Sequence, residues 1–177
     1  MLSLDRYFIV VIFIFILFPC NFAFSEIIFS QVIETFETKE NGIMKFNQLV
    51  GIAIDKDGKI YAADFRNFGI QIFDSNGNFD SFISIEGKPH GVEVLEDKVY
   101  VPVWGEVVAH ENSHIELFFT NGTKITSFLG PLQPGDIAIN HLGNIYVTDY
   151  HGSGTIEIFD SSGNLLETLT VPLTSDG

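Results

Sequence analysis

The chain has 177 residues, of which 46% are apolar, and this is enough for one globular domain with a buried core. It carries 23 acidic and 9 basic residues, which gives a formal charge of −14 at pH 7. Because such a surface repels phosphate backbones, we expect no nucleic-acid partner. The single cysteine, Cys20, excludes a framework of disulfides within the chain.

The first 25 residues have the pattern of a secretory signal peptide. An apolar run extends from Tyr7 to Phe18, and small residues shortly after it suit cleavage before Glu26. The run is shorter than the roughly 20 residues that a membrane-spanning helix needs. We therefore expect residues 1–25 to be a signal peptide of a secreted or cell-surface protein. A membrane anchor formed by an uncleaved leader is the second choice.

Residues 26–48 are predicted to form an N-terminal strand and a linker. The segment Ile27–Phe36 is rich in β-branched and aromatic residues and ends like the last strand of a later repeat, since Glu34-Thr-Phe36 matches Glu167-Thr-Leu169. In propellers, a strand near the N-terminus can form the outer strand of a blade whose other strands come from the C-terminal end of the chain.

The remainder of the chain repeats itself. Asn-Gly or Ser-Gly turns place glycines at Gly77, Gly122 and Gly163, which are 45 and 41 residues apart in the sequence. A period of about 40 residues is typical of propeller blades. Three blades are predicted within residues 49–177, at residues 49–83, 89–129 and 134–170.

Each copy contains four short strand-like stretches. In the first copy these are Ile52-Ala-Ile54, Lys59–Ala63, Ile70-Gln-Ile72 and a stretch that ends at Phe82. The third stretch alternates apolar and polar residues, which predicts a strand with one buried side. Intervening Asp-Gly and Asn-Gly pairs favour tight hairpin turns.

These motifs resemble NHL repeats. The resemblance lies in Lys88-Pro-His-Gly-Val92, in Gly-x-Ile-Tyr-Val-x-Asp at Gly143–Asp149, and in Ile-x-Ile-Phe-Asp-x-x-Gly at Ile156–Gly163. It implies an all-β fold, an NHL-type β-propeller that forms an incomplete arc of three four-stranded blades plus an N-terminal strand. The second copy departs from the pattern at Pro102, where we expect the strand to end or bulge because proline cannot donate a ladder hydrogen bond.

Three blades cannot close a ring, because propellers usually have four to eight. An open arc would expose two apolar blade faces, about 800 Å² in total from strand spacing and length. The sequence therefore predicts that the chain is part of a longer propeller. Self-association of arcs that closes the ring is the alternative.

A binding surface is predicted on one face of the propeller. The tight hairpins lie at one end of the strands, so the starts of the first strands and the loops between second and third strands share the other end. Trp104 and Tyr150 are aromatic residues of the kind that anchor partners. The predicted binding residues are Arg66, Asn67, His90, Trp104, His110, His114, Tyr150 and His151.

The segment His110-Glu-Asn-Ser-His114 has the His-Glu-x-x-His spacing of zinc proteases. That chemistry needs a helix, which would place both imidazoles on one side. The flanking residues favour strands, so we interpret the spacing as coincidental. No cofactor is expected, although zinc at the histidines or calcium is conceivable. The segments Asp55–Gly58 and Asp74–Asn78 are interpreted as turns, and Asp64 as an acceptor for loop amides.

The predicted function is that of an exported, non-catalytic scaffold that binds a protein, a small molecule or a glycan at its loop face. No catalytic residue is assigned. The alternative is a metal-assisted lyase or hydrolase, in which His90 would be a metal ligand.

Overall fold

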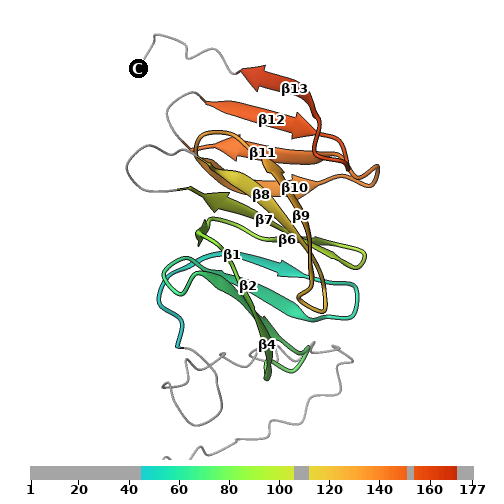
Figure 1. Cartoon of the computed structure of the whole chain (residues 1–177). Helices are drawn as coiled ribbons and strands as arrows, with labels where there is room; N and C mark the ends of the chain where they lie inside the picture. The colour runs from blue at the N-terminus through green and yellow to red at the C-terminus, as the bar shows by residue number, and fades with distance from the viewer. Residues whose placement is uncertain (1–44, 106–111, 151–153, 171–177) are drawn as a thin grey trace, which may run out of the picture. The chain divides into compact units, whose positions relative to one another are not determined.

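The computed structural model describes residues 45–105, 112–150 and 154–170, all within one compact unit, Gln31–Gly177 (Figure 1). These residues form thirteen strands and contain no helix, so none could span a membrane as a helix. The predicted signal peptide at 1–25 and the predicted strand at 27–36 lie outside the described residues. Cys20 also lies outside them.

The strands form three antiparallel sheets, which are the three predicted blades. In blades 1 and 3 four consecutive strands pair in sequence order. Blade 1 contains β1 (Leu49–Ile54), β2 (Ile60–Asp64), β3 (Gly69–Phe73) and β4 (Phe79–Ser84). Blade 3 contains β10 (Pro134–Ile139), β11 (Ile145–Asp149), β12 (Thr155–Phe159) and β13 (Leu165–Thr170).

In blade 2 the first strand is divided into two short pieces that both pair with the second strand. The pieces precede a long second strand, so the blade has five strands in total. They are β5 (Lys88–Pro89), β6 (Glu93–Leu95), β7 (Lys98–Trp104), β8 (His114–Phe119) and β9 (Lys124–Leu129).

The expectation that the second strand ends or bulges at Pro102 is wrong. β7 continues through this residue, and Pro102 pairs with Ile115 of β8 in an unbroken register. Instead the first strand is interrupted opposite Pro102. The Pro102 carbonyl accepts a hydrogen bond from the His90 backbone N–H at 2.9 Å, but the proline offers no N–H in return. The missing donor therefore faces the gap between β5 and β6.

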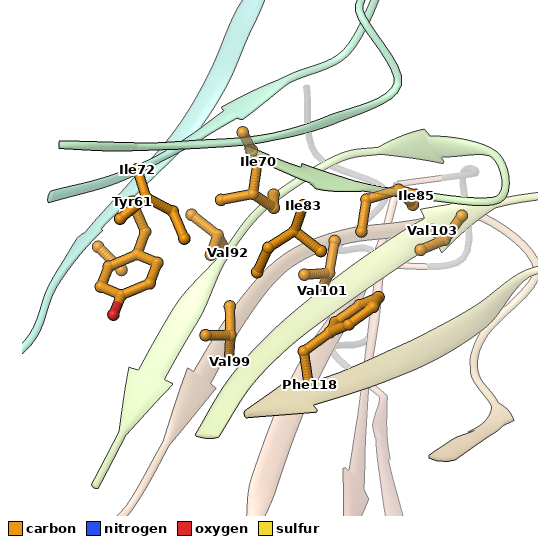
Figure 2. Close-up of a cluster of buried hydrophobic side chains, with 12 residues drawn as sticks. Tyr61, Ile70, Ile72, Ile83, Ile85, Val92, Val99, Val101, Val103 and Phe118 are labelled. Carbon is orange, nitrogen blue, oxygen red and sulfur yellow. The ribbon is translucent and has the colours of Figure 1, made fainter. Parts of the chain in front are cut away.

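Apolar side chains hold the blades together face to face. One cluster joins blades 1 and 2, with Tyr61, Ile70 and Ile83 packed against Val99, Val101 and Phe118 (Figure 2). A second cluster joins blades 2 and 3. It contains Tyr100, Ile115, Leu117, Ile137, Ile145, Val147 and Phe159.

The first strands of successive blades approach one another closely. A Cβ added to Gly51 would lie 2.9 Å from the Gly91 Cα, and one added to Gly91 would lie 3.3 Å from the Gly135 carbonyl oxygen. Side chains at these points would collide, which explains the small residues at the start of each copy. The blades therefore converge at their first strands, as in a propeller.

The strand ends define two faces. The tight turns at residues 55–58, 74–78, 120–123, 140–143 and 160–163 share one end, the right side of Figure 1, and we call it the hairpin face. The loop face, at the other end, carries residues 45–48, 65–68, 86–90, 104–105, 130–134 and 150. Five glycines of the hairpin face have φ between 82° and 85°, as such turns require. They are Gly58, Gly77, Gly122, Gly143 and Gly163.

The first strand of blade 1 exposes apolar residues that are covered in the other blades. Ile52 and Ile54 are 67% and 62% exposed, whereas Val92, which corresponds to Ile52 in blade 2, is 4% exposed. The difference arises because Val92 packs in the cluster that blade 1 forms with blade 2. This exposure fits the description of a partial propeller. Ring closure by self-association remains a prediction.

Candidate functional site

An aromatic residue follows the second strand of every blade. The strand registers match Asp64, Val103 and Asp149 to one another, because each pairs with the start of its own first strand. The residue immediately after them is Phe65 in blade 1, Trp104 in blade 2 and Tyr150 in blade 3.

The backbone fixes these residues in the same way. The N–H of Phe65 donates to the Gln48 carbonyl at 2.8 Å, and the N–H of Tyr150 donates to the Gln133 carbonyl at 2.7 Å. In blade 2 the equivalent pairing is between Trp104 and Lys88. The repeat therefore places one aromatic side chain per blade on the loop face.

The three rings meet around His90. The imidazole of His90 stacks on the Trp104 indole, with ring centroids 3.8 Å apart and planes 13° from parallel. Phe65 meets His90 edge to face at 5.2 Å, and Tyr150 lies 6.0 Å from the His90 centroid. Trp104 also lies 6.0 Å from Phe65 and 6.1 Å from Tyr150. We call Phe65, His90, Trp104 and Tyr150 the aromatic cluster.

The cluster bridges all three blades. The Trp104 indole N–H of blade 2 donates to the Pro134 carbonyl of blade 3 at 2.8 Å. This bond restricts the indole while leaving part of it accessible. Tyr150, by contrast, is 71% exposed, which is a large apolar surface for a ring on a structured loop.

Burial sets the charge state of the cluster. Desolvation by burial lowers the pKa of His90 below its ordinary value of 6.5. The imidazole is therefore neutral at pH 7, which suits a ring stacked on an indole. The cluster presents aromatic surface without a charge of its own.

Lys88 contacts the cluster, and Arg66 follows one of its residues in the chain. The Lys88 ammonium lies 5.0 Å from the centroid of the Phe65 ring, within the range of a cation–π contact. Arg66 follows Phe65 in the chain, and its Nε donates to the Gln48 side-chain oxygen at 2.9 Å. Basic groups therefore lie on the Phe65 side of the cluster.

A buried carboxylate supports this part of the loop face. Asp64 is fully buried at the end of β2 and accepts hydrogen bonds from the backbone N–H groups of Asn47 and Gln48. It also accepts from the side-chain amides of Asn67, at 2.8 Å, and Gln71, at 3.0 Å. The Asn67 amide donates in addition to the Lys45 carbonyl at 2.7 Å. Asp64 accepts loop amides as predicted, and Asn67 serves to hold the loop.

His114 lies in a different environment from the cluster. It begins β8, and its Nε2 lies 3.3 Å from Oε1 of Glu116, a buried carboxylate that also accepts from the Lys124 ammonium. The hydrogen bond to Glu116 raises the pKa of His114. Burial alone would raise the pKa of Glu116, but the bonds from His114 and Lys124 outweigh it and lower that pKa.

The other predicted histidines, His110 and His151, lie outside the described residues. Within the His-Glu-x-x-His segment, Asn112 has a φ of 68° and His114 starts a strand, so this half of the segment is not helical. The part of the chain that the structure describes contains no group of three or more His, Cys, Asp or Glu side chains that could hold a metal.

Sequence reasoning identified His90, Trp104 and Tyr150 but missed Phe65 and Lys88. Phe65 could have been found by aligning the residue after the second strand in all three copies. Lys88 has no comparable signal, because its aromatic partner belongs to another blade.

Comparisons with known proteins agree with this architecture. The family model described as NHL repeat matches residues 46–73. The protein brain tumor from Drosophila melanogaster is 28% identical over 135 residues, which cover 72% of this chain and 13% of that protein.

Solved structures with this fold include a hydrazine synthase from Kuenenia stuttgartiensis, with a TM-score of 0.61 and 16% identity over 72% of this chain and 38% of that one. A streptogramin B lyase matches with a TM-score of 0.57 and 19% identity over 70% of this chain and 41% of that one. The chain thus spans less than half the length of these proteins. At such low identity the likeness concerns the fold alone.

The fold is therefore a β-propeller arc of three blades. Within this arc, residues 46–73 match the NHL repeat, and the protein brain tumor is a distant relative.

Proposed function

We propose that this protein is an exported, non-catalytic scaffold that binds its partner at the loop face. The observation that carries the proposal is the aromatic cluster, in which each blade contributes one ring and Tyr150 remains 71% exposed. Export is supported by the signal-peptide pattern of residues 1–25.

Aromatic residues held rigidly on loops are favoured anchors for partners, since they supply contact area with little loss of conformational freedom. The Trp104–Pro134 hydrogen bond and the stack with His90 provide that rigidity. Loops placed by a propeller scaffold commonly carry function, while the sheets supply the framework.

Site-specific photo-crosslinking tests the proposal. A photoreactive amino acid in place of Tyr150, in the full chain expressed in its native host, is expected to give a discrete adduct of higher mass. Ser162 is the matched control because it is also exposed and belongs to the same blade, but lies on the hairpin face. Adducts from position 162 and none from position 150 would contradict the assignment of the face.

Elemental analysis tests the non-catalytic part of the proposal. The purified full chain is expected to hold no stoichiometric zinc or calcium. One equivalent of either metal that is lost in His90→Ala would instead support a metal-assisted lyase or hydrolase.

A further inference from the structure

The basic groups beside the aromatic cluster indicate which chemistry the loop face recognises. We propose that the cluster, together with Lys88 and Arg66, binds an acidic segment of a protein partner. A carboxylate of that segment contacts Lys88 and Arg66, and an apolar or aromatic side chain covers Tyr150 and Trp104. This inference rests on the proposed binding function of the same face.

Lys88 has no acidic partner among the residues that the structure describes. No ion pair or hydrogen bond to its ammonium is found among the described residues, although the sequence carries 23 acidic groups. On the hairpin face, in contrast, Lys56 pairs with Asp57 and Lys59 pairs with Asp80, each at 2.8 Å. In a chain with a charge of −14, a lysine that contacts the half-buried Phe65 ring and has no carboxylate partner in the described part of the chain is available to an anionic partner.

Arg66 points to the same chemistry. The Nε of Arg66 bonds to the neutral side chain of Gln48, and no ion pair involving this guanidinium is found in the described part of the chain. Guanidinium groups recognise carboxylates with two parallel hydrogen bonds. Arg66 is the next residue after Phe65 in the sequence, and the Lys88 ammonium lies over the Phe65 ring.

Several neutral polar groups of the face already have partners within the protein. The Trp104 indole N–H bonds to Pro134, the Asn67 amide to Lys45 and Asp64, and the Gln48 side-chain oxygen to Arg66. A neutral glycan needs many free donors and acceptors for its hydroxyl groups, and these three groups already have partners within the protein. Apolar surface next to positive charge suits a peptide that combines carboxylates with apolar side chains.

Isothermal titration of the full chain with matched synthetic peptides tests the inference. The probes are eight-residue peptides that alternate tryptophan with glutamate, with glutamine or with lysine, together with an oligogalacturonate as an acidic glycan. The glutamate peptide is expected to bind about tenfold more tightly than the glutamine peptide, since a charge-assisted contact contributes about 1.4 kcal/mol or more.

Variants locate the effect. Lys88→Gln is expected to remove most of the preference for glutamate over glutamine, whereas Tyr150→Ala weakens the binding of both peptides. Lys56→Gln, on the hairpin face, is the control and leaves both affinities unchanged. Circular dichroism spectra that match those of the unaltered chain confirm that each variant is folded.

Other results would overturn the inference. These are equal affinity for the glutamate and glutamine peptides, tighter binding of the lysine peptide, or tighter binding of the oligogalacturonate. If all peptides bind equally and Tyr150→Ala weakens the binding of each, the proposal that the partner segment is acidic is wrong, but the proposed aromatic binding face is retained. If the binding of every probe is insensitive to Tyr150→Ala, the proposed function fails as well.

Discussion

The two ends of the blades use their polar residues differently. On the hairpin face one side-chain oxygen of Asp55, Asp74, Asn140 and Asp160 accepts two backbone N–H groups of its own turn, at 2.8–3.0 Å. On the loop face the repeat instead places an aromatic residue at one position of every blade. Repetition at the hairpin face thus serves the fold, whereas repetition at the loop face presents a surface.

Removal of the Asp64 carboxylate is expected to produce the largest change. Asp64→Ala leaves several buried donors without an acceptor, and each costs about 1–3 kcal/mol, so we expect a loss of about 3–5 kcal/mol in the free energy of unfolding. Urea denaturation measures it. Asp74→Ala, on the exposed hairpin face, is the matched control and should lose clearly less. Equal losses would remove the distinction between the two faces.

Loss of the bond between blades 2 and 3 has a smaller expected effect. Trp104→Phe keeps an aromatic ring on His90 but removes the N–H donor to Pro134, which should lower the free energy of unfolding by about 1 kcal/mol. Tyr150→Phe is the control, since the only hydrogen bond found for Tyr150 among the described residues uses its backbone N–H. A larger loss in the control would contradict the account of the cluster.

The two histidines should give opposite dependences of stability on pH. Because burial lowers the pKa of His90, its stabilisation is complete above the unfolded pKa of about 6.5 and is lost as the pH falls through the folded pKa. The pKa of His114 is raised, so its stabilisation is complete below about pH 6.5 and is lost as the pH rises through the folded pKa.

Urea midpoints between about pH 5 and 8 test this difference. His90→Phe should flatten the decline on the acidic side, and His114→Gln should flatten the decline on the alkaline side. If each variant keeps the pH profile of the unaltered chain, the two environments are not those described.

The smallest effect is expected for the exposed ion pairs of the hairpin face. Lys56→Ala removes a pair in which both side chains are highly exposed, and solvent screening makes such pairs weak. The urea midpoint should be unchanged within error. A clear loss would show that the hairpin face contributes more to stability than its exposure indicates.

Local sequence patterns predicted most of the fold. Alternation in Ile70-Gln-Ile72 and the Asn-Gly turns located strands and hairpins correctly, because both are properties of a few neighbouring residues. The expectation that only one side of this strand is buried is wrong, since all five residues of β3 are buried and Gln71 bonds to the buried Asp64. The continuation of β7 through Pro102 was not predicted, because it depends on a gap in the neighbouring strand. The presence of a proline does not by itself show whether its own strand or the neighbouring strand is interrupted.

The site was predictable in part. Trp104 is the single tryptophan of the chain and ends β7 at the loop face, and His90 is one of five histidines. Phe65 is one of 18 phenylalanines, so its residue type alone carries little information. It is recognised only when the strand registers align it with Trp104 and Tyr150. The stack of His90 on Trp104 and the contact of Lys88 with Phe65 join separate segments, and spacing along the chain does not encode them.

The most direct test of the loop face as the binding surface is a two-dimensional amide NMR titration of the ¹⁵N-labelled full chain with the unlabelled glutamate–tryptophan peptide. Trp104 gives the single indole N–H resonance of the protein, which serves as an internal reporter. We predict that this resonance and the Tyr150 amide shift on addition of the peptide, while the amides of Gly58, Gly77 and Gly122 stay in place. Shifts confined to those hairpin glycines, with an unmoved indole resonance, would contradict the account.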